Sequence, residues 1–311
     1  MPARRLTESG CCVSPFWSPD SRWVAYVDLP ASGSLAEVLA VPADGGDPRL
    51  AFTHVGVVSA DWTLLAYPQA GRTFVEFVAS SERWAVPNEG RGVWLSPAGH
   101  AVAWEIGSRG ITHPDLRERA IWVANADGSG AEEWVRLWGG GFVGWTNGGQ
   151  DVIVSGRLQA EGPSGLWRIE RDKGRAVLLV EAEQPRDPLL SPSGEWLAFY
   201  QAFDSGPGEN GLWIVRTDGS QVSRIDLFGA YRWRRDGQLL VIPLDVDGPG
   251  AAIWQVDAAS GAEARLTNPW QAPLHISGND WQVSPDGSMV VFLSSVDRSL
   301  WVLDLPMPSG S

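Results

Sequence analysis

The sequence predicts an all-β fold, a seven-bladed β-propeller formed by a single domain of residues 1–311. A short strand pattern with an aromatic or aliphatic column recurs at spacings of 38 to 47 residues, which is the period of a four-stranded propeller blade. Pro and Gly interrupt the chain too often for a 3.6-residue hydrophobic period to persist over several turns, so helices are not expected. The column residues are Leu39, Trp84, Trp122, Trp167, Trp213, Trp254 and Trp301.

A turn motif lies upstream of each column residue and separates the first two strands of a blade. Ser18-Pro19-Asp20 and Ser284-Pro285-Asp286 show it clearly. Pro suits the first corner of such a turn because its φ angle is fixed, and Asp accepts hydrogen bonds from nearby backbone groups. A short apolar run bounded by turn residues follows each motif, which predicts the second strand of the blade. These runs are 23–27, 64–67, 101–104, 152–154, 196–200, 239–242 and 289–293.

An Arg followed by an apolar residue marks the fourth strand in four of the units, as in Arg265-Leu266-Thr267. Only residues 91–94 separate the second unit from the next strand, so a truncated second blade is expected. The last unit lacks a fourth strand, whereas Ala3-Arg4-Arg5-Leu6-Thr7 repeats the Arg-Leu-Thr pattern. The N-terminus is therefore expected to complete the seventh blade, since an open sheet edge leaves backbone groups unpaired. The predicted blades are approximately 11–52, 53–90, 91–138, 139–182, 183–227, 228–267, and 268–306 with 3–8.

These repeats resemble the WD40-like repeats of TolB-type β-propellers. The resemblance rests on the Trp17-Ser18-Pro19-Asp20 turn, the Leu212-Trp213-Ile214-Val215 line and the Arg265-Leu266-Thr267 end, and it extends over essentially the whole chain. The family's propellers also occur attached to prolyl-oligopeptidase hydrolase domains and in oligogalacturonate lyases. This sequence has no Gly-x-Ser-x-Gly nucleophile elbow. Such repeats specify a fold and carry little information about function.

The composition excludes some partners. A formal net charge of −13 and a pI near 4.7 oppose binding to nucleic acid or to an anionic membrane surface. No apolar run reaches the length of a membrane span, so membrane insertion is not expected. The segment 1–10 lacks the apolar core of a secretory signal. A cytoplasmic location is therefore expected, or an exported one if a signal peptide has been trimmed.

The connections between strands two and three, and between blades, vary in length and composition, whereas the other turns are short and uniform. In a propeller the variable set would form a loop-rich rim around the mouth of the central channel, where binding residues accumulate. An aromatic ring, an imidazole and a carboxylate there could orient a ligand, or the same groups could satisfy the backbone of their own loops. The candidate ligand-binding residues are Arg109, His113, Trp270, His275, Asp280 and Trp281.

A metal site is a weaker possibility, and no cofactor is predicted. His54, His113 and His275 fall in connections of the expected rim and could bind a divalent ion together. They come singly, without the short-range spacing of a metal motif, and the resemblance to oligogalacturonate lyases implies such a site only by analogy.

The sequence favours a non-catalytic binding or scaffold module that recognises a protein, a peptide or a small ligand at this rim. No catalytic residue is predicted, because no acid, base and nucleophile occur in a recognisable pattern. The alternative is a metal-assisted polysaccharide lyase, or a glycoside hydrolase that needs two carboxyl groups at a fixed separation at the channel mouth. A third possibility is an assembly role, in which another chain adds a strand to an uneven blade edge.

Overall fold

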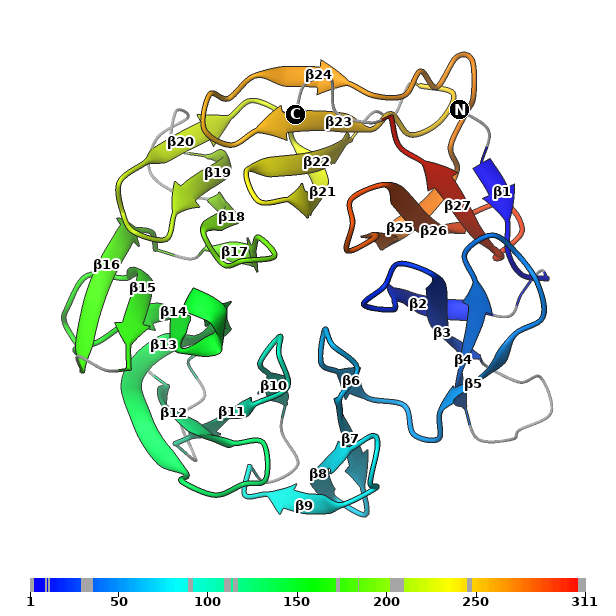
Figure 1. Cartoon of the computed structure of the whole chain (residues 1–311). Coiled ribbons are helices and arrows are strands. Elements are labelled where there is room, and N and C mark those ends of the chain that lie inside the picture. Colours follow the sequence, from blue (N-terminus) through cyan, green and yellow to red (C-terminus); the bar gives the residue numbers. More distant parts are fainter. Residues whose placement is uncertain are drawn as a thin grey trace. The chain divides into compact units, whose positions relative to one another are not determined.

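The computed structural model describes residues 3–8, 10, 12–28, 36–88, 92–108, 113, 117–171, 174–183, 185–201, 210–244 and 248–306. These residues form five four-stranded sheets and one seven-stranded sheet, all antiparallel, with one short 3-10 helix, η2 (Asn147–Gly149) (Figure 1). The all-β prediction is confirmed. The chain divides into two compact units, which are described separately: unit 1 is Met1–Val55 with Leu227–Ser311, and unit 2 is Gly56–Asp226. No helix in the described part of the chain is long and apolar enough to cross a membrane.

Unit 1 contains three of the four-stranded sheets, with orders β2-β3-β4-β5, β21-β22-β23-β24 and β1-β27-β26-β25. Their strands are β1 (Ala3–Arg5), β2 (Cys12–Trp17), β3 (Trp23–Asp28), β4 (Glu37–Pro42), β5 (Arg49–Phe52), β21 (Gly229–Arg235), β22 (Gln238–Pro243), β23 (Trp254–Asp257), β24 (Glu263–Arg265), β25 (Ile276–Val283), β26 (Met289–Ser294) and β27 (Leu300–Asp304).

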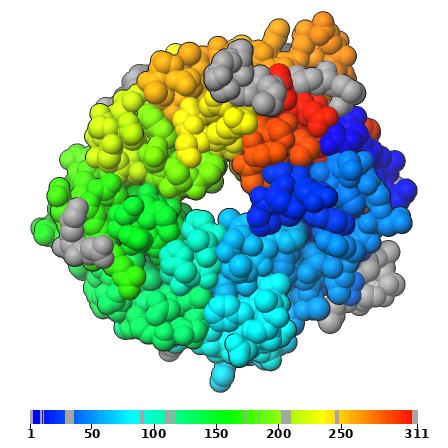
Figure 2. All heavy atoms as spheres, viewed as in Figure 1, coloured from blue at the N-terminus to red at the C-terminus, as the bar shows by residue number. Residues whose placement is uncertain are grey.

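The N-terminal strand adds to the last sheet, as the Arg-Leu-Thr pattern predicted. Arg4 lies opposite Val302 in an antiparallel ladder between β1 and β27. The ladder continues where the Leu6 amide donates to the Leu300 carbonyl at 2.8 Å. In Figure 2 the dark blue atoms of the N-terminus lie beside the red atoms of the C-terminal strand. The backbone groups at this edge of β27 are therefore paired, which removes the open edge that the last unit would otherwise present.

Unit 2 contains two four-stranded sheets, β6-β7-β8-β9 and β17-β18-β19-β20, and the seven-stranded sheet β10 to β16. Their strands are β6 (Val57–Val58), β7 (Leu64–Gln69), β8 (Arg72–Phe77), β9 (Arg83–Val86), β10 (Val93–Leu95), β11 (Ala101–Gly107), β12 (Glu118–Asn125), β13 (Glu132–Thr146), β14 (Asp151–Arg157), β15 (Gly165–Glu170), β16 (Arg175–Glu181), β17 (Arg186–Leu190), β18 (Trp196–Gln201), β19 (Gly211–Arg216) and β20 (Val222–Ile225).

The prediction of seven separate blades is wrong, because two of the expected blades share one strand. The first part of β13 pairs with β12 and the second part pairs with β14, which joins both sets of strands into the seven-stranded sheet (Figure 1). The ladder register with β14 shifts between Trp138 and Gly141. Gly139 and Gly140 have φ angles of 67° and 58°, a left-handed conformation that glycine adopts without steric cost. The three consecutive glycines therefore form a bulge at which β13 changes partner.

The expected truncation of the second blade is also wrong, since β6 to β9 form a complete four-stranded sheet. Trp84 lies in the fourth strand of this sheet, and the third strand is β8. A tight turn with positive φ at Ala70 and Gly71 connects β7 to β8, as in two-residue hairpins. Trp84 therefore belongs to the fourth strand of its sheet, whereas the sequence prediction had placed it in the third. The sheet is complete at Trp84, so the short segment after it does not have to form another strand.

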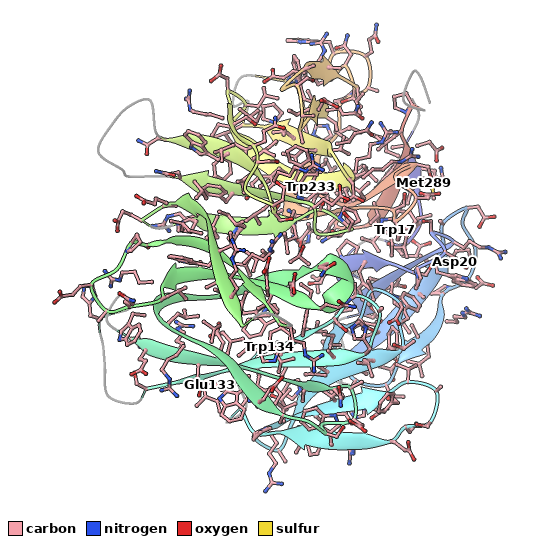
Figure 3. The ribbon with its side chains drawn as sticks, turned by 60° about the vertical axis from the view of Figure 1, so that its left-hand side comes forward. Trp17, Asp20, Glu133, Trp134, Trp233 and Met289 are labelled. Atoms are coloured by element: carbon pink, nitrogen blue, oxygen red, sulfur yellow. The ribbon has the colours of Figure 1, made fainter. Side chains whose placement is uncertain are left out.

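The Ser-x-Asp motif stabilises the turns by local hydrogen bonds, as the sequence indicated. The Ser18 hydroxyl donates to Asp20 Oδ1 at 2.6 Å, and the amide of Trp23 donates to Ser18 Oγ at 2.9 Å. The hydrogen bond from Ser18 is the main reason why the pKa of Asp20 is lowered. The acids in these turns therefore have a structural role. Figure 3 labels Asp20, together with Trp17 and Met289 of the same unit.

The tryptophans pack between neighbouring sheets within each unit. Trp104 is almost fully buried, and its ring centroid lies 6.2 Å from that of Trp84 and 6.3 Å from that of Trp122. In unit 1, Trp17 and Trp281 are buried in the two core clusters. Large aromatic rings fill the space between splayed sheets, which accounts for much of the high Trp content.

Candidate functional site

The structure distributes the sequence-predicted ligand-binding residues between the two units. Arg109 lies outside the described residues, and His113 of unit 2 is exposed. In unit 1, Trp270 is 77% exposed and His275 is exposed, whereas Asp280 is partly buried. Trp281 is fully buried and belongs to a hydrophobic core, with the Arg232 guanidinium 5.4 Å from its ring. Trp270 therefore presents a ring to solvent, and Trp281 contributes to packing.

The three histidines of the weak metal prediction come from both units. His54 Nδ1 lies 3.1 Å from the Thr53 hydroxyl, and the His275 carbonyl accepts a hydrogen bond from the Ser295 amide. Across the described ranges, no group of three or more His, Cys, Asp or Glu side chains could hold a metal ion. The structure thus offers no metal site for which ligands can be named.

One cavity of unit 2 lies at one end of its strands and has a volume of about 560 Å³. The turns from β13 to β14, β17 to β18 and β19 to β20, together with the end of β15, line it. We call it the acidic cavity. Its lining residues are Thr146, Asn147, Gly148, Asp151, Arg168, Glu170, Ser193, Gly194, Glu195, Arg216, Thr217 and Asp218.

Both arginines of the acidic cavity are neutralised by acids of the same cavity. Arg168 forms an ion pair with the buried Glu170 and donates to the Thr217 carbonyl at 3.0 Å. Arg216 lies 3.3 Å from the Asp218 carboxylate. A hydrogen bond from the Ser220 hydroxyl, more than the nearby guanidinium groups, lowers the pKa of Asp218. These two pairs contribute no net charge.

Two other acids leave the cavity with an excess of negative charge. Asp151 is 9% exposed and accepts hydrogen bonds from the Arg171 amide at 3.2 Å and the Asn147 side-chain amide at 3.3 Å, both neutral donors. The carboxylate of Glu195 has no hydrogen-bond or ion-pair partner in the part of the chain that the structure describes. An ionised carboxylate favours a cationic partner. The excess of two negative charges therefore selects for a cation.

A rigid turn holds this cavity open. Gly194 adopts a φ of 79°, and a Cβ atom there would lie 2.7 Å from the Cα atom of Thr146. The hydroxyls of Thr146 and Thr217 each donate to the Gly194 carbonyl at 2.7 Å. The turn that carries Glu195 is thereby fixed to β13 on one side and to β19 on the other. A pre-organised site loses less entropy when a ligand binds.

A smaller cavity of about 290 Å³ lies toward the other end of the same strands. We call it the glycine-lined cavity, because the backbone of the β13 bulge forms part of it. Its lining residues are Trp138, Gly139, Gly140, Ser155, Gly156, Arg157, Ser164, Glu183, Pro185 and Arg186. It lies among the longer connections, where the sequence predicted binding residues.

A third cavity of about 270 Å³ belongs to unit 1 and adjoins the connection from β24 to β25. Asn268 and Gln271 line it, and Trp270 lies between them in sequence without being one of its lining residues. The Trp270 amide donates to Asn268 Oδ1 at 3.1 Å. This contact satisfies the loop's own backbone, which was the alternative interpretation of the polar groups in this segment.

Comparisons with known proteins concern the fold. No protein-family model matches the sequence, and neither does any curated protein sequence. An oligogalacturonate lyase in complex with manganese is 13% identical, with a TM-score of 0.65, and the match covers 98% of this chain and 96% of that one. An oligogalacturonate lyase from Vibrio parahaemolyticus is 10% identical, with a TM-score of 0.66 and coverages of 99% and 94%. An acylaminoacyl peptidase from Pyrococcus horikoshii is 13% identical, with a TM-score of 0.65, and only 53% of its chain is covered.

The likeness shows the fold. The chain is a β-propeller in fold class, and at these identities the activities of the neighbours do not transfer to it. Membership of the TolB-type repeat family stays a prediction from the sequence motifs.

Proposed function

We propose that this chain is a non-catalytic recognition module whose acidic cavity binds the cationic group of a peptide or a small molecule. The observation that carries the proposal is the pair of acids, Asp151 and Glu195, which no basic side chain of the cavity neutralises. The net charge of −13 favours the approach of cationic ligands over anionic ones. Nucleic acid is accordingly not a proposed partner.

The chemistry of the lining supports binding more than catalysis. The acidic cavity contains no His or Cys, the side chains that most often act as base or thiol nucleophile near neutral pH. Its volume of about 560 Å³ lies within the range of small-molecule sites. A guanidinium group is the best-matched cation, because its planar donors can address a carboxylate with two parallel hydrogen bonds.

The proposed position differs from the one that the sequence favoured. From the sequence, we expected binding residues in the variable connections. The acidic cavity instead lies among short turns that are similar in each sheet. Charged residues at the ends of β15 and β19 make these particular turns different from the others. The exposed ring of Trp270 and the other candidates in the long connections remain a separate proposal for ligand contact.

The proposal is tested with a ligand pair that differs only in charge, N-acetyl-arginine amide and N-acetyl-citrulline amide. Isothermal titration should detect binding of the arginine compound and at least about tenfold weaker binding of the neutral one, since one charge-assisted contact contributes about 1.5 to 3 kcal/mol. Glu195→Gln should lower the affinity for the arginine compound. Glu161→Gln should leave this affinity unchanged, because Glu161 is an exposed acid outside the cavity. Equal binding of both compounds, or no effect of Glu195→Gln, would contradict the proposal.

The described residues do not support a metal-assisted lyase. The manganese belongs to the neighbour, and the likeness to that enzyme shows the fold alone. Because the described residues provide no cluster of metal-ligating side chains, no step through a metal ion can be assigned to named residues.

A further inference from the structure

We infer that the open edge of β16 is an interaction surface, which binds a second copy of this chain by antiparallel strand pairing. β16 is the last strand of the seven-stranded sheet (Figure 1). Among the described residues, no backbone hydrogen bond joins β16 to any strand other than β15. The N–H and C=O groups on its other edge are therefore available, and such a row of groups is a template for pairing with another strand.

β16 is longer than the strands in the corresponding fourth position of the other sheets. β5, β9, β20, β24 and β1 have three or four residues each, whereas β16 has seven. Short edge strands, Pro and charged side chains commonly keep a sheet edge from pairing. Residues 176–180 of β16 are Ala-Val-Leu-Leu-Val and contain none of these obstacles. The edge is thus long enough, and apolar enough, to accept a partner strand.

Residues 132–137 of β13 also form a long edge, but their charges are already paired. This segment forms a ladder with β12 and has no strand on its other side in the part of the chain that the structure describes. Arg136 forms ion pairs with Glu118 and Glu133. Charged side chains in the middle of an edge protect it from pairing. The edge of β16 is therefore the better candidate of the two.

The charges at the two ends of β16 are complementary when the strand pairs with its own copy. Arg175 and Glu181 are exposed, and neither side chain has an ion-pair or hydrogen-bond partner within the described ranges. With a two-fold axis at Leu178, antiparallel pairing places Arg175 of each copy opposite Glu181 of the other. Opposite charges that face each other across two strands stabilise the pairing. This self-complementarity identifies a second copy as the occupant of the edge.

The apolar residues between the charges supply the rest of the interface. Val177, Leu178 and Val180 are only partly buried, so each has surface left to bury against the partner strand. Leu179 is buried at a bulge in the ladder with β15 and contributes little of its side chain. One pair of strand edges is smaller than the interface of about 1,200 Å² or more that a stable complex buries. A weak dimer that forms with rising protein concentration is therefore expected.

Sedimentation velocity on the full chain, from about 5 to 500 µM protein, tests this inference. The wild type should shift from monomer to dimer as the concentration rises. Arg175→Glu and Glu181→Arg should each weaken the dimer at least about tenfold, because like charges then face each other at both ends of the interface. The double variant with Arg175→Glu and Glu181→Arg should recover the dimer, since it exchanges the two charges and restores the opposite pairs.

Arg72→Glu is the matched control. Arg72 is an exposed arginine at the start of β8, an internal strand of its sheet, and its replacement changes the net charge as much as Arg175→Glu does. This variant should dimerise like the wild type.

A wild type that stays monomeric at the highest concentration, a double variant that does not recover the dimer, or equal losses in Arg72→Glu and Arg175→Glu would overturn the inference. No residue of β16 lines the acidic cavity, so failure here does not affect the proposed function.

Discussion

The two cavities of unit 2 lie toward opposite ends of the same strands and are built by different means. Side chains on tight turns form the acidic cavity, and the charges come from residues such as Asp151 and Glu195. The backbone of a glycine bulge forms much of the other cavity, which Arg157 and Arg186 also line. The same strands therefore form two cavities with different linings, because each end of an antiparallel sheet carries its own connections.

The largest effect is expected from glycine substitutions, since one glycine of each cavity has a similar positive φ angle. Gly140 has a φ of 58° and a virtual Cβ in collision with backbone, whereas Gly148 has a φ of 64° with nothing within 4 Å. Gly140→Ala should lower the free energy of unfolding by more than about 3 kcal/mol, and Gly148→Ala by about 1 kcal/mol. Urea denaturation measures both. Similar losses in the two variants would mean that β13 does not need its bulge.

A smaller loss of stability is expected when Glu105, which accepts a hydrogen bond from the Phe142 amide beside the bulge at 2.7 Å, loses its charge. Glu105→Gln should lower the free energy of unfolding by about 2 kcal/mol, because it leaves Arg119 in a largely buried site without its anionic partner. Glu133→Gln is the control, since Glu133 pairs with the half-exposed Arg136 on the first part of β13 (Figure 3) and exposed pairs contribute less than about 1 kcal/mol. Equal losses in the same denaturation experiment would contradict the role given to Glu105.

Higher ionic strength should weaken the binding of a cation to the acidic cavity. Raising salt from about 0.05 M to 0.5 M shortens the Debye length several-fold, so the affinity for N-acetyl-arginine amide should fall by a factor of about two to five. Titration calorimetry at both salt concentrations checks this. A salt-independent affinity would show that the negative charge of the cavity does not contribute to binding.

The smallest effect concerns the pH dependence of stability near the acidic cavity. Hydrogen bonds from Ser220 lower the folded-state pKa of Asp218 below its ordinary value of 3.8. Its contribution to stability is therefore complete above pH 3.8 and is lost as the pH falls through the lower folded-state pKa. Ser220→Ala should melt at a slightly lower temperature than the wild type at pH 7, and the difference should shrink as the pH is lowered below 3.8. A difference that does not shrink with falling pH would assign the effect to packing.

Repeated local signals in the sequence predicted the recurring turns and many of the strands. The Ser18-Pro19-Asp20 turn, the tryptophan column and the strand at Arg4 were recognisable because each depends on residues close together in the chain. The predicted number of blades was wrong because Gly139-Gly140-Gly141 continues a strand instead of ending it. Alternation in Thr73-Phe74-Val75-Glu76-Phe77 after Gly71 was the signal for the overlooked strand β8.

The cavities could not be predicted from the sequence, because their charged residues are far apart along the chain. Asp151 and Glu195 are 44 positions apart, and no spacing rule connects acids on the turns of different sheets. Their significance depends on which neighbouring charges cancel, as Arg168 and Glu170 do. Ion pairing of this kind follows from packing, and a charge run or motif in the sequence does not reveal it.

The most direct test of the cation preference of the acidic cavity is one titration series with N-acetyl-arginine amide in three proteins: the wild type, Glu195→Gln and Arg157→Gln, which changes a residue outside this cavity. We expect the affinity to fall about tenfold in Glu195→Gln and to be unchanged in Arg157→Gln. Equal affinities in all three proteins, or a loss in Arg157→Gln alone, would contradict the proposed site.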